Sequence, residues 1–310
     1  MRVQIPQNPV ISKKLLEGQA VLPKPEWLKI RPPTTEKFAH IKGLLKGKNL
    51  HTVCTEAHCP NITECWSGGT ATFMLMGDTC TRACRFCMVK SGNPQKKLDK
   101  DEPQKLMEAI ADMKLNYIVL TCVTRDDLPD GGASHFSDCI KALKKAHPAL
   151  LIEVLISDLN GNMDALKVIV ESGPEVIAHN VETIERLQKA IRDPRANYQK
   201  SLGVLENVKK LEPKIYTKSS LMLGLGESEE EVIQAMKDLL AIGVSVVTFG
   251  QYLRPSPFHV PVTEYVPPAQ FKKYEILAKE LGFLYCAAGP FVRSSYKAGE
   301  LFMKNVLRKN

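Results

Sequence analysis

The chain has 310 residues, 44% of them hydrophobic and 25% charged, which is typical of a folded globular protein and excludes a chain that is disordered throughout. Its 42 basic and 34 acidic residues leave a formal charge of +8, but the Lys-Lys pairs are spread out rather than gathered in one stripe, so a nucleic-acid partner is not indicated. No apolar stretch approaches the roughly 18 residues of a membrane span, and residues 1–9 are polar where a signal peptide is apolar, so we expect a cytoplasmic protein without membrane contact.

The N-terminal part of the chain shows no clear periodicity. Residues 1–50 are basic and interrupted by prolines, and we interpret them as an arm that lies on the body of the protein. The polar segment that follows carries three cysteines, Cys54, Cys59 and Cys65, with no fourth cysteine in the group. It is expected to form a loop with one turn of helix.

Beyond this segment, apolar strand-like runs alternate with amphipathic helical segments. Strands are expected at 71–76, 117–121, 150–156, 175–178, 215–223 and 244–252. Helices are expected at 101–113, 133–146, 163–171, 182–191 with 200–211, 229–242 and 268–281. Six strand-helix units in succession predict an α/β fold with parallel strands and right-handed crossovers. Because a closed barrel has eight such units, we expect an incomplete barrel that is open on one side.

This pattern divides the chain into an arm with the first cysteine loop (1–67), the barrel (68–282) and a C-terminal extension (283–310). Ligands of such folds gather at the C-terminal ends of the strands. Four segments at these ends are rich in polar residues or glycine: 122–132, 179–182, 224–227 and 250–255. Any one of them could be a surface turn, but their recurrence at one end of the sheet indicates a pocket there.

A second group of three cysteines, Cys80, Cys84 and Cys87, follows the first predicted strand within eight residues. Three thiolates on one loop can bind one iron-sulfur cluster and leave one of its four irons open for another ligand. A structural zinc site would need a fourth ligand at short spacing, and the next cysteine, Cys122, lies in an apolar run. Zinc and inert buried thiols are the alternatives, and two such groups in one chain favour clusters.

Other candidate residues have simpler interpretations. The isolated cysteines, Cys122, Cys139 and Cys286, are expected in the core. His179 is expected to be a hydrogen-bonded structural residue rather than a metal ligand. The segment 224–226 is a weak indication of phosphate binding, because the third glycine of a dinucleotide-binding motif is missing.

Several motifs carry a family resemblance. Cys80-x3-Cys84-x2-Cys87, with Phe86 before the last cysteine, resembles the signature of the radical S-adenosylmethionine (SAM) enzymes. Further stretches, in order along the chain, resemble those of the lipoyl synthases. They are Cys54-x4-Cys59-x5-Cys65, Pro60-Asn61-Ile62-x-Glu64-Cys65-Trp66, Arg125-Asp126-Asp127-Leu128 with Gly131-Gly132, His179-Asn180-x-Glu182-Thr183, Gly250-Gln251-Tyr252 and Arg293-Ser294-Ser295-Tyr296.

The resemblance implies a partial (β/α)6 barrel of the TIM type with N-terminal and C-terminal extensions. It implies two 4Fe-4S clusters and SAM as cofactors, and insertion of two sulfur atoms at carbons 6 and 8 of an octanoyl chain on a carrier lysine. The implied partners are the octanoylated lipoyl carrier protein or domain, a low-potential electron donor such as ferredoxin or flavodoxin, and an iron-sulfur carrier for cluster repair.

The resemblance also implies residue roles. The cluster of Cys80, Cys84 and Cys87 would bind SAM and generate a 5′-deoxyadenosyl radical. The auxiliary cluster, held by Cys54, Cys59 and Cys65, would donate the sulfur, with Ser294 as its fourth ligand. The residues expected to contact SAM are Phe86, Asn180 and Glu182, and the segments 122–132 and 224–227 are expected to help hold its methionine and ribose.

Two departures from the lipoyl synthase pattern affect only substrate and cofactor contacts. Thr124 stands where the family more often has Asp, and the stretch 157–159 reads Ser-Asp-Leu where Pro-Asp-Phe is commoner. The alternatives are another sulfur-inserting radical enzyme, similar to biotin synthase or a methylthiotransferase, and a non-catalytic iron-sulfur or zinc protein that binds nucleic acid. The scattered Lys-Lys pairs argue against the last of these.

Overall fold

The computed structural model describes residues 22–29, 36–56, 59, 61–67, 72–113, 115 and 117–295. The predictions that concern Pro60, Tyr296 and the rest of the arm and of the C-terminal extension lie outside these residues. Among the described residues, no helix combines the length and the apolar character needed to cross a bilayer.

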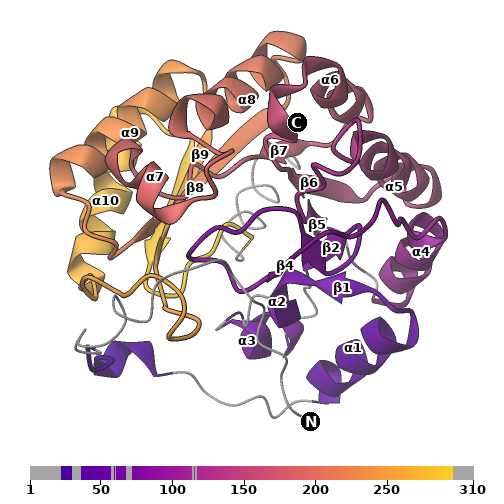
Figure 1. Cartoon of the computed structure of the whole chain (residues 1–310), viewed down its shortest axis with the longest axis horizontal. Helices are drawn as coiled ribbons and strands as arrows, with labels where there is room; N and C mark the ends of the chain where they lie inside the picture. Colours follow the sequence, from indigo (N-terminus) through magenta and orange to yellow (C-terminus); the bar gives the residue numbers. More distant parts are fainter. Residues whose placement is uncertain are drawn as a thin grey trace.

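One curved, eight-stranded sheet forms the inside of the molecule, and helices surround it (Figure 1). The strands in their spatial order are β1 (His51–Thr52), β2 (Thr72–Leu75), β5 (Tyr117–Cys122), β6 (Leu151–Leu155), β7 (Val176–Ala178), β8 (Tyr216–Leu223), β9 (Val246–Gln251) and β10 (Tyr285–Gly289). All neighbours are parallel except β1, which runs antiparallel to β2. In the part of the chain that the structure describes, the sheet does not close on itself, so the fold is the predicted incomplete barrel.

The outer layer consists of α4 (Glu102–Met113), α5 (Ala133–Ala146), α6 (Met163–Glu171), α7 (Gln188–Ile191), α8 (Tyr198–Leu211), α9 (Glu229–Ala241) and α10 (Pro268–Leu281). Local sequence explains α9 well. Ser228 and Glu231 form a capping box at its N-terminus, and Val232, Met236 and Leu239 turn one face into the core. The six predicted strands are confirmed, with ends that differ by a few residues, and so are the predicted helices except 182–191, which is reduced to the 3-10 turn η4 (Glu185–Leu187) and the short α7.

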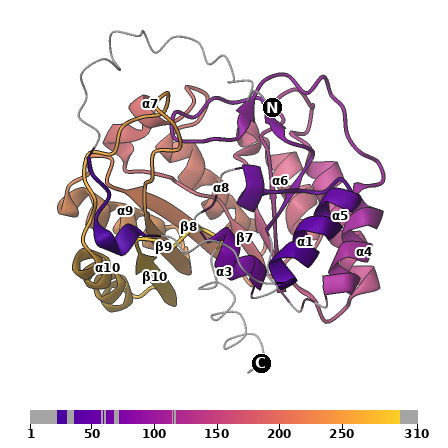
Figure 2. The same ribbon diagram turned by 90° about the horizontal axis from the view of Figure 1, so that it is seen from below.

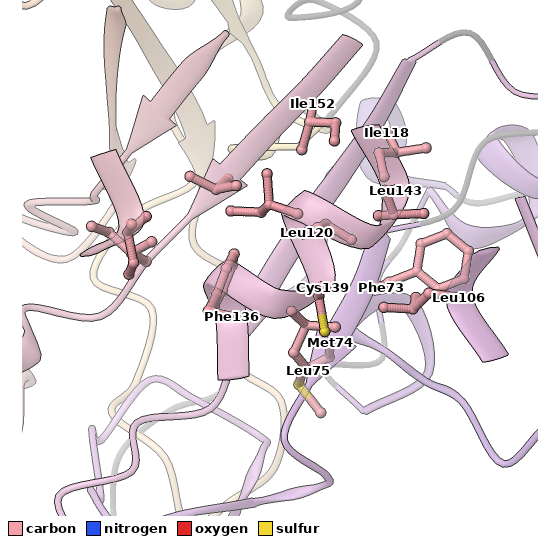
Figure 3. Packing of buried hydrophobic residues seen from close by; sticks show 14 of the residues in the cluster. Phe73, Met74, Leu75, Leu106, Ile118, Leu120, Phe136, Cys139, Leu143 and Ile152 are labelled. Carbon is pink, nitrogen blue, oxygen red and sulfur yellow. The ribbon is translucent and has the colours of Figure 1, made fainter. Parts of the chain in front are cut away.

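The core between sheet and helices is apolar and nearly inaccessible to solvent. In its first half, Phe73, Ile118, Leu120 and Ile152 of the sheet meet side chains of α4 and α5 (Figure 3). The predictions for two isolated cysteines are confirmed here, because Cys139 is 0% exposed in this cluster and Cys286 is 2% exposed in the neighbouring one.

The short strands β1, β3 (Thr79–Cys80) and β4 (Lys90–Ser91) were not predicted, and three larger features were also missed. Residues 36–47 form a helix, α1 (Glu36–Gly47), whose Ile41 and Leu45 are buried in the main core. The first cysteine segment contains two short helices, α2 (Val53–Glu56) and α3 (Ile62–Ser67), rather than one turn. The extension adds the strand β10, parallel to β9. Each element is short or weakly patterned, so its apolar positions indicate structure only when the partner surface is known.

The N-terminal region lies on both sides of the barrel opening (Figure 2). The 3-10 turn η2 (Glu26–Leu28) lies near α10, where Tyr265 donates a hydrogen bond to the carbonyl of Leu22 (3.4 Å). Helix α1 lies near α4, and Lys48, just past the end of α1, pairs with Glu108 of α4 (2.7 Å). Helices α2 and α3 lie in the opening between these two contacts (Figure 1).

Candidate active site

A cavity of about 400 Å³ lies at the C-terminal ends of β8 and β9. It brings together residues from the N-terminal region, the barrel and the extension. The predicted site residues that line it are Cys54, Cys59, Cys65, Phe86, Cys87, Asn180, Glu182 and Ser294. Cys80 and Cys84 lie on the same loop as Cys87 but do not line the cavity. Segments that are far apart in the sequence thus meet at one space.

The loop of Cys80, Cys84 and Cys87 leaves the barrel after β2 and is framed by a small parallel sheet of β3 (Thr79–Cys80) and β4 (Lys90–Ser91). The backbone N–H of Cys87 donates to the carbonyl of Cys84 (3.1 Å), which makes a tight turn between these two cysteines. The N–H of Gly92 donates to the carbonyl of Cys80 (2.9 Å). The three thiols are therefore held on a compact loop at the C-terminal edge of the barrel.

The loop after β9 covers this turn. His259 Nε2 lies 3.0 Å from the carbonyl oxygen of Cys87, and the N–H of Val260 donates to the carbonyl of Arg85 (3.1 Å). The hydroxyl of Tyr252 donates to the carbonyl of Val260 (2.8 Å). These contacts attach the cysteine loop to the far side of the barrel.

The thiols of both groups lie in apolar surroundings. Burial raises the pKa of Cys54 and of Cys84 to about 11 and that of Cys87 to about 12, and the pKa of Cys59 is also raised. Repulsion from neighbouring thiols raises these pKa values further: Cys59 acts on Cys54, Cys80 acts on Cys84, and Cys80 and Cys84 act on Cys87. Metal binding must therefore displace the protons of these thiols.

The spacing of the sulfur atoms argues against zinc. Four thiolates around one zinc ion lie roughly 3.8 Å apart, because Zn–S bonds are about 2.3 Å and the geometry is tetrahedral. Among the described residues, neither group of three cysteines brings all its sulfur atoms within 4.8 Å of one another. Each thiolate of an iron-sulfur cluster binds a different iron, which requires wider spacing. The donor set of each group therefore fits a cluster better than a single ion.

One group of potential ligands does have close spacing, but it lies outside the cavity. Glu102, His135 and Cys139 place their ligand atoms within 4.8 Å of one another. The Glu102 carboxylate already accepts the backbone N–H of Met76 (3.0 Å) and lies 2.6 Å from His135 Nε2. We interpret this group as a satisfied structural contact at the end of β2.

The auxiliary group is built on α2 and α3. Cys54 lies in α2, Cys65 lies in α3, and the N–H of Cys59 donates to the carbonyl of Cys54 (3.1 Å). Hydrogen bonds from the Thr72 backbone and the Trp66 side chain lower the pKa of Cys54, although burial outweighs them. A metal-bound thiolate at Cys54 would keep these N–H donors.

The C-terminal extension reaches the auxiliary group. Gly250 of β9 lies so close to this segment that an added Cβ would clash with the carbonyl of Val292. The side-chain amide of Asn61 donates to the carbonyl of Phe291 (2.5 Å). Half-buried Arg293 lies near Cys59, and its positive charge acts to lower the pKa of that thiol. Together these contacts position Ser294 in the same cavity as Cys54, Cys59 and Cys65.

Two of the predicted SAM contacts, Asn180 and Glu182, follow β7, whereas Phe86 lies on the cysteine loop. The backbone of Glu182 has a positive φ of 68°, which is unusual for glutamate and typical of functional sites. Burial raises the pKa of Glu182, and its carboxylate accepts the side-chain N–H of Asn180 (3.1 Å). The other amide atom of Asn180, Oδ1, is buried without a hydrogen-bond partner among the described residues, in a residue that lines the cavity. An unpaired polar atom at this place fits a bound ligand that donates to it.

Other predicted candidates have structural roles. Both ring nitrogens of His179 are occupied, by the carbonyl of Ile156 (2.9 Å) and the hydroxyl of Ser201 (3.0 Å), and burial lowers its pKa to about 4. This confirms the interpretation of His179 as a structural residue. At Gly224 a side chain would clash with Gln251 and with the backbone of Glu264, so this glycine serves packing.

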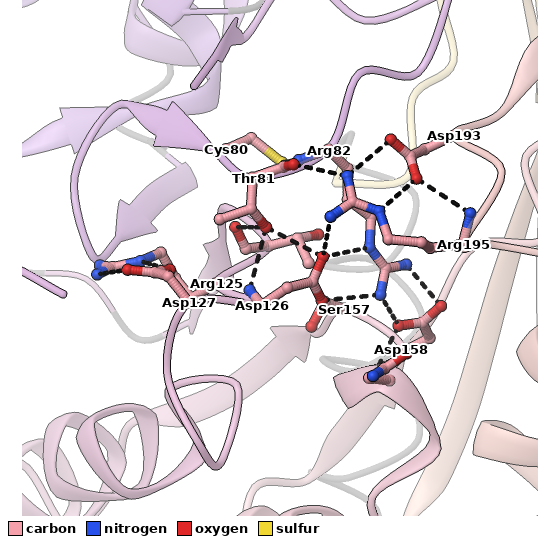
Figure 4. A network of polar contacts seen from close by, with 12 residues as sticks. Cys80, Thr81, Arg82, Arg125, Asp126, Asp127, Ser157, Asp158, Asp193 and Arg195 are labelled. Atoms are coloured by element: carbon pink, nitrogen blue, oxygen red, sulfur yellow. Dashed lines mark hydrogen bonds and ion pairs between the residues drawn. The ribbon is translucent and has the colours of Figure 1, made fainter. Parts of the chain in front are cut away.

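The acidic segment after β5 also differs from expectation. It was expected to help hold the cofactor, but Asp127 pairs with Arg125 (2.8 Å), and Asp130 accepts the backbone N–H groups of Gly132 and Ser134 (both 2.9 Å). Asp126, in the same segment, has a role that the sequence did not predict, because it binds Arg82 and Arg195 of the network around the cysteine loop (Figure 4). The one signal for this role in the sequence is Arg82, since an arginine between two cysteines of a buried loop requires carboxylate partners.

Comparison with known proteins agrees with this geometry. The family model of the radical SAM superfamily matches residues 74–239, and that of the N-terminal domain of lipoyl synthase matches residues 8–59. The lipoyl synthase of Thermus thermophilus is 53% identical over 285 residues, which cover 92% of this chain and 88% of that protein. The lipoyl synthase of Anaeromyxobacter dehalogenans is 54% identical over 281 residues, which cover 91% of this chain and 95% of the other.

Solved structures share the fold at low sequence identity. The FeFe-hydrogenase maturase HydG from Carboxydothermus hydrogenoformans is 16% identical and has a TM-score of 0.53; the match covers 88% of this chain and 72% of that chain. At this identity the likeness supports the barrel architecture alone.

Proposed function

The chain belongs to the lipoyl synthase family of the radical SAM superfamily, and we propose that it inserts two sulfur atoms, at carbons 6 and 8, into an octanoyl chain held on a lysine of a carrier protein or domain. One observation carries the proposal. Residues of both cysteine groups line the same cavity as Ser294, so a substrate bound there can reach both groups without leaving.

The residues of the chain fit two clusters and SAM. Cys80, Cys84 and Cys87 would hold one 4Fe-4S cluster, and the auxiliary cysteines with Ser294 would hold the other. Phe86, Asn180 and Glu182 would contact SAM, and the unpaired Oδ1 of Asn180 supports this assignment. When bound, these groups supply one electron, a 5′-deoxyadenosyl radical able to take hydrogen from an unactivated C–H bond, and the sulfur atoms.

The rest of the cavity wall suits an acyl chain. Besides the cysteines, its lining includes Val53, Met88, Leu221, Met222, Leu253 and Val292. The ring of Tyr252 adds apolar surface, because its hydroxyl is already bonded to a carbonyl. Such a wall binds an octanoyl chain and excludes water, which protects a reactive intermediate from side reactions.

Ser294 would bind iron through an alkoxide oxygen, whereas the cysteines would bind through thiolate sulfur. Its hydroxyl must lose a proton to become a ligand, and the resulting alkoxide is strongly basic and readily takes the proton back. A ligand that leaves in this way suits a cluster that is taken apart as its sulfur bonds to carbon. The nearby guanidinium of Arg293 favours the charged form of an acidic group beside it.

The partners follow from the same chemistry. We propose an octanoylated carrier as substrate, a ferredoxin or flavodoxin as electron donor, and an iron-sulfur carrier that rebuilds the auxiliary cluster. The formal charge of +8 would speed encounter with an acidic carrier at low ionic strength.

The test is anaerobic purification, quantification of iron and sulfide, and addition of reductant, SAM and an octanoyl-lysine peptide, with the peptide followed by mass spectrometry. Two clusters per chain and a peptide that gains two sulfur atoms are expected. SAM cleavage without change of the peptide would show that the enzyme acts on an acyl group other than the octanoyl-lysine of this peptide. Zinc in place of iron, or a single cluster, would contradict the assignment of the six cysteines.

A further inference from the structure

The loop of Cys80, Cys84 and Cys87 contains an arginine, Arg82, that binds side chains at the ends of two strands. Arg82 is 5% exposed and makes paired hydrogen bonds to two carboxylates (Figure 4). Its Nε and Nη2 donate to Asp126 (both 3.0 Å), and its Nη1 and Nη2 donate to Asp158 (both 2.6 Å). Asp126 follows β5 and Asp158 follows β6, so one side chain ties the loop to two strand ends.

A second anchor comes from the segment after α7. The Asp193 carboxylate accepts the backbone N–H of Ala83 (2.9 Å), and Arg195 holds Asp193 by a 2.8 Å contact. Arg195 also reaches Asp126 (3.1 Å) and donates to the carbonyl of Thr81 (2.7 Å). The loop is therefore held from two sides by one connected network of two arginines and three aspartates.

The network also places hydrogen-bond donors on two sulfur atoms. The backbone N–H of Arg82 donates to Cys80 Sγ (3.4 Å), and the backbone N–H of Asp193 donates to Cys84 Sγ (3.3 Å). Hydrogen bonds to cluster sulfur and nearby charges are among the factors that set reduction potentials of iron-sulfur clusters. Because Arg82 and Asp193 are themselves members of the network, their side chains hold these two donors in position.

We propose that Arg82, Asp193 and Arg195 are positioning residues for the SAM-binding cluster, which preset the cysteine loop before the cluster arrives and tune the reduction potential of the bound cluster. The inference rests on the proposed function, in which Cys80, Cys84 and Cys87 hold that cluster. It assigns no contact with SAM or substrate to the three residues.

The signs of the effects follow from the charges. Loss of the Arg82 cation leaves Asp126 and Asp158 less compensated, and a more negative surrounding makes reduction of the cluster harder. Loss of the Asp193 anion has the opposite effect. A residue that only stabilises the fold would change cluster content without this reversal of sign.

The experiment compares Arg82→Met, Arg82→Lys and Asp193→Asn in the full-length enzyme. A redox titration follows the EPR signal that changes when SAM is added, because this signal reports the cluster with the open iron. We expect Arg82→Met to lower the potential and to slow SAM cleavage about 10- to 100-fold. Arg82→Lys should restore the potential toward the wild-type value, and Asp193→Asn should raise it.

Arg186→Met is the matched control. Arg186 pairs with Glu231 through two nitrogens, as Arg82 does with its partners, but it is 57% exposed, and its partners Glu231 and the carbonyl of Gly226 lie outside the cysteine loop. The Arg186→Met variant should keep the wild-type reduction potential of the cluster and the wild-type rate of SAM cleavage. In cluster-free protein, hydrogen exchange of residues 81–87 should be faster in Arg82→Met than in wild type or in the control.

The outcomes separate the two proposals. If the wild-type enzyme has no SAM-responsive signal, the proposed function fails. If wild type has the signal, and both Arg82→Met and Asp193→Asn keep its potential and the exchange rates of the loop, the positioning role is wrong. Should Arg82→Met fail to fold, Asp193→Asn alone decides, because it keeps an oxygen acceptor for Ala83.

Discussion

The loop of Cys80, Cys84 and Cys87 is anchored to the barrel by buried charged side chains, whereas the auxiliary group of Cys54, Cys59 and Cys65 is assembled from short helices and a C-terminal segment. The first loop makes paired contacts to the ends of β5 and β6 and a further contact to the segment after α7. The second relies on the amide of Asn61 and on close approach to Gly250. The difference matches the proposed reaction, in which one cluster returns unchanged after each turnover and the other is taken apart.

The largest effects are expected from substitution of the cysteines, which should separate the roles of the two groups. Cys87→Ala is expected to abolish both SAM cleavage and sulfur insertion, because the loop loses a ligand. Cys59→Ala is expected to abolish sulfur insertion and to leave SAM cleavage intact. Both products are measured by mass spectrometry, and iron content should fall by about half in each variant. Equal loss of SAM cleavage in both variants would show that the two groups do not act separately.

A smaller effect is expected from the fourth ligand of the auxiliary group. Ser294→Ala should lower sulfur insertion about 10- to 100-fold while SAM cleavage continues, since a lost ligand or its support typically costs this much. Ser294→Cys should hold the cluster more firmly and therefore also slow insertion. The comparison variant is Ser295→Ala, which also removes a hydroxyl from the cavity wall. If Ser295→Ala is impaired and Ser294→Ala is not, the ligand assignment moves to Ser295.

The path of the C-terminal segment can be tested at Gly250. Gly250→Ala introduces a clash with the carbonyl of Val292 and should push the segment with Ser294 away from the auxiliary group. We expect about a tenfold loss of sulfur insertion with little change in SAM cleavage, the same pattern as Ser294→Ala. Gly203→Ala is the matched control, because its added methyl meets nothing within 4 Å in α8. In that helix the change should be neutral or stabilise by about 0.4–1 kcal/mol. A wild-type rate of sulfur insertion in Gly250→Ala would contradict the placement of the Ser294 segment against Gly250.

The smallest expected effect is on the pH dependence of the barrel's stability, through the buried side chain of His179. Burial lowers the pKa of His179 to about 4, below its ordinary value of 6.5, so the folded protein binds its proton less readily than the unfolded chain. The stability that His179 contributes is therefore complete above pH 6.5 and is lost as pH falls from 6.5 through 4. Thermal unfolding of cluster-free protein should show this slope, and His179→Gln should flatten it. An unchanged slope in His179→Gln would assign the acid sensitivity to other groups.

Local sequence was sufficient wherever the structure is local. The alternation of strands and helices from β2 to α10 could be read from periodicity, since each amphipathic segment reports its own buried face. The spacings of the two cysteine groups indicated clusters because each group lies on one short stretch. Elements with weak periodicity, such as α1 and β10, were missed because their burial depends on surfaces contributed by other parts of the chain.

The sequence by itself determined the barrel, the two groups of thiols and, through resemblance, the family chemistry. Only the tertiary structure decided which residues support these groups. Arg82 meets partners 44 and 76 residues away, and Asn61 holds a carbonyl 230 residues away. Such pairs depend on strand order and on the crossing of distant segments, and neither leaves a trace in the local pattern of residues. The same holds for Ser294, which lines the cavity, and for Gly250, which leaves space for the segment that carries Ser294.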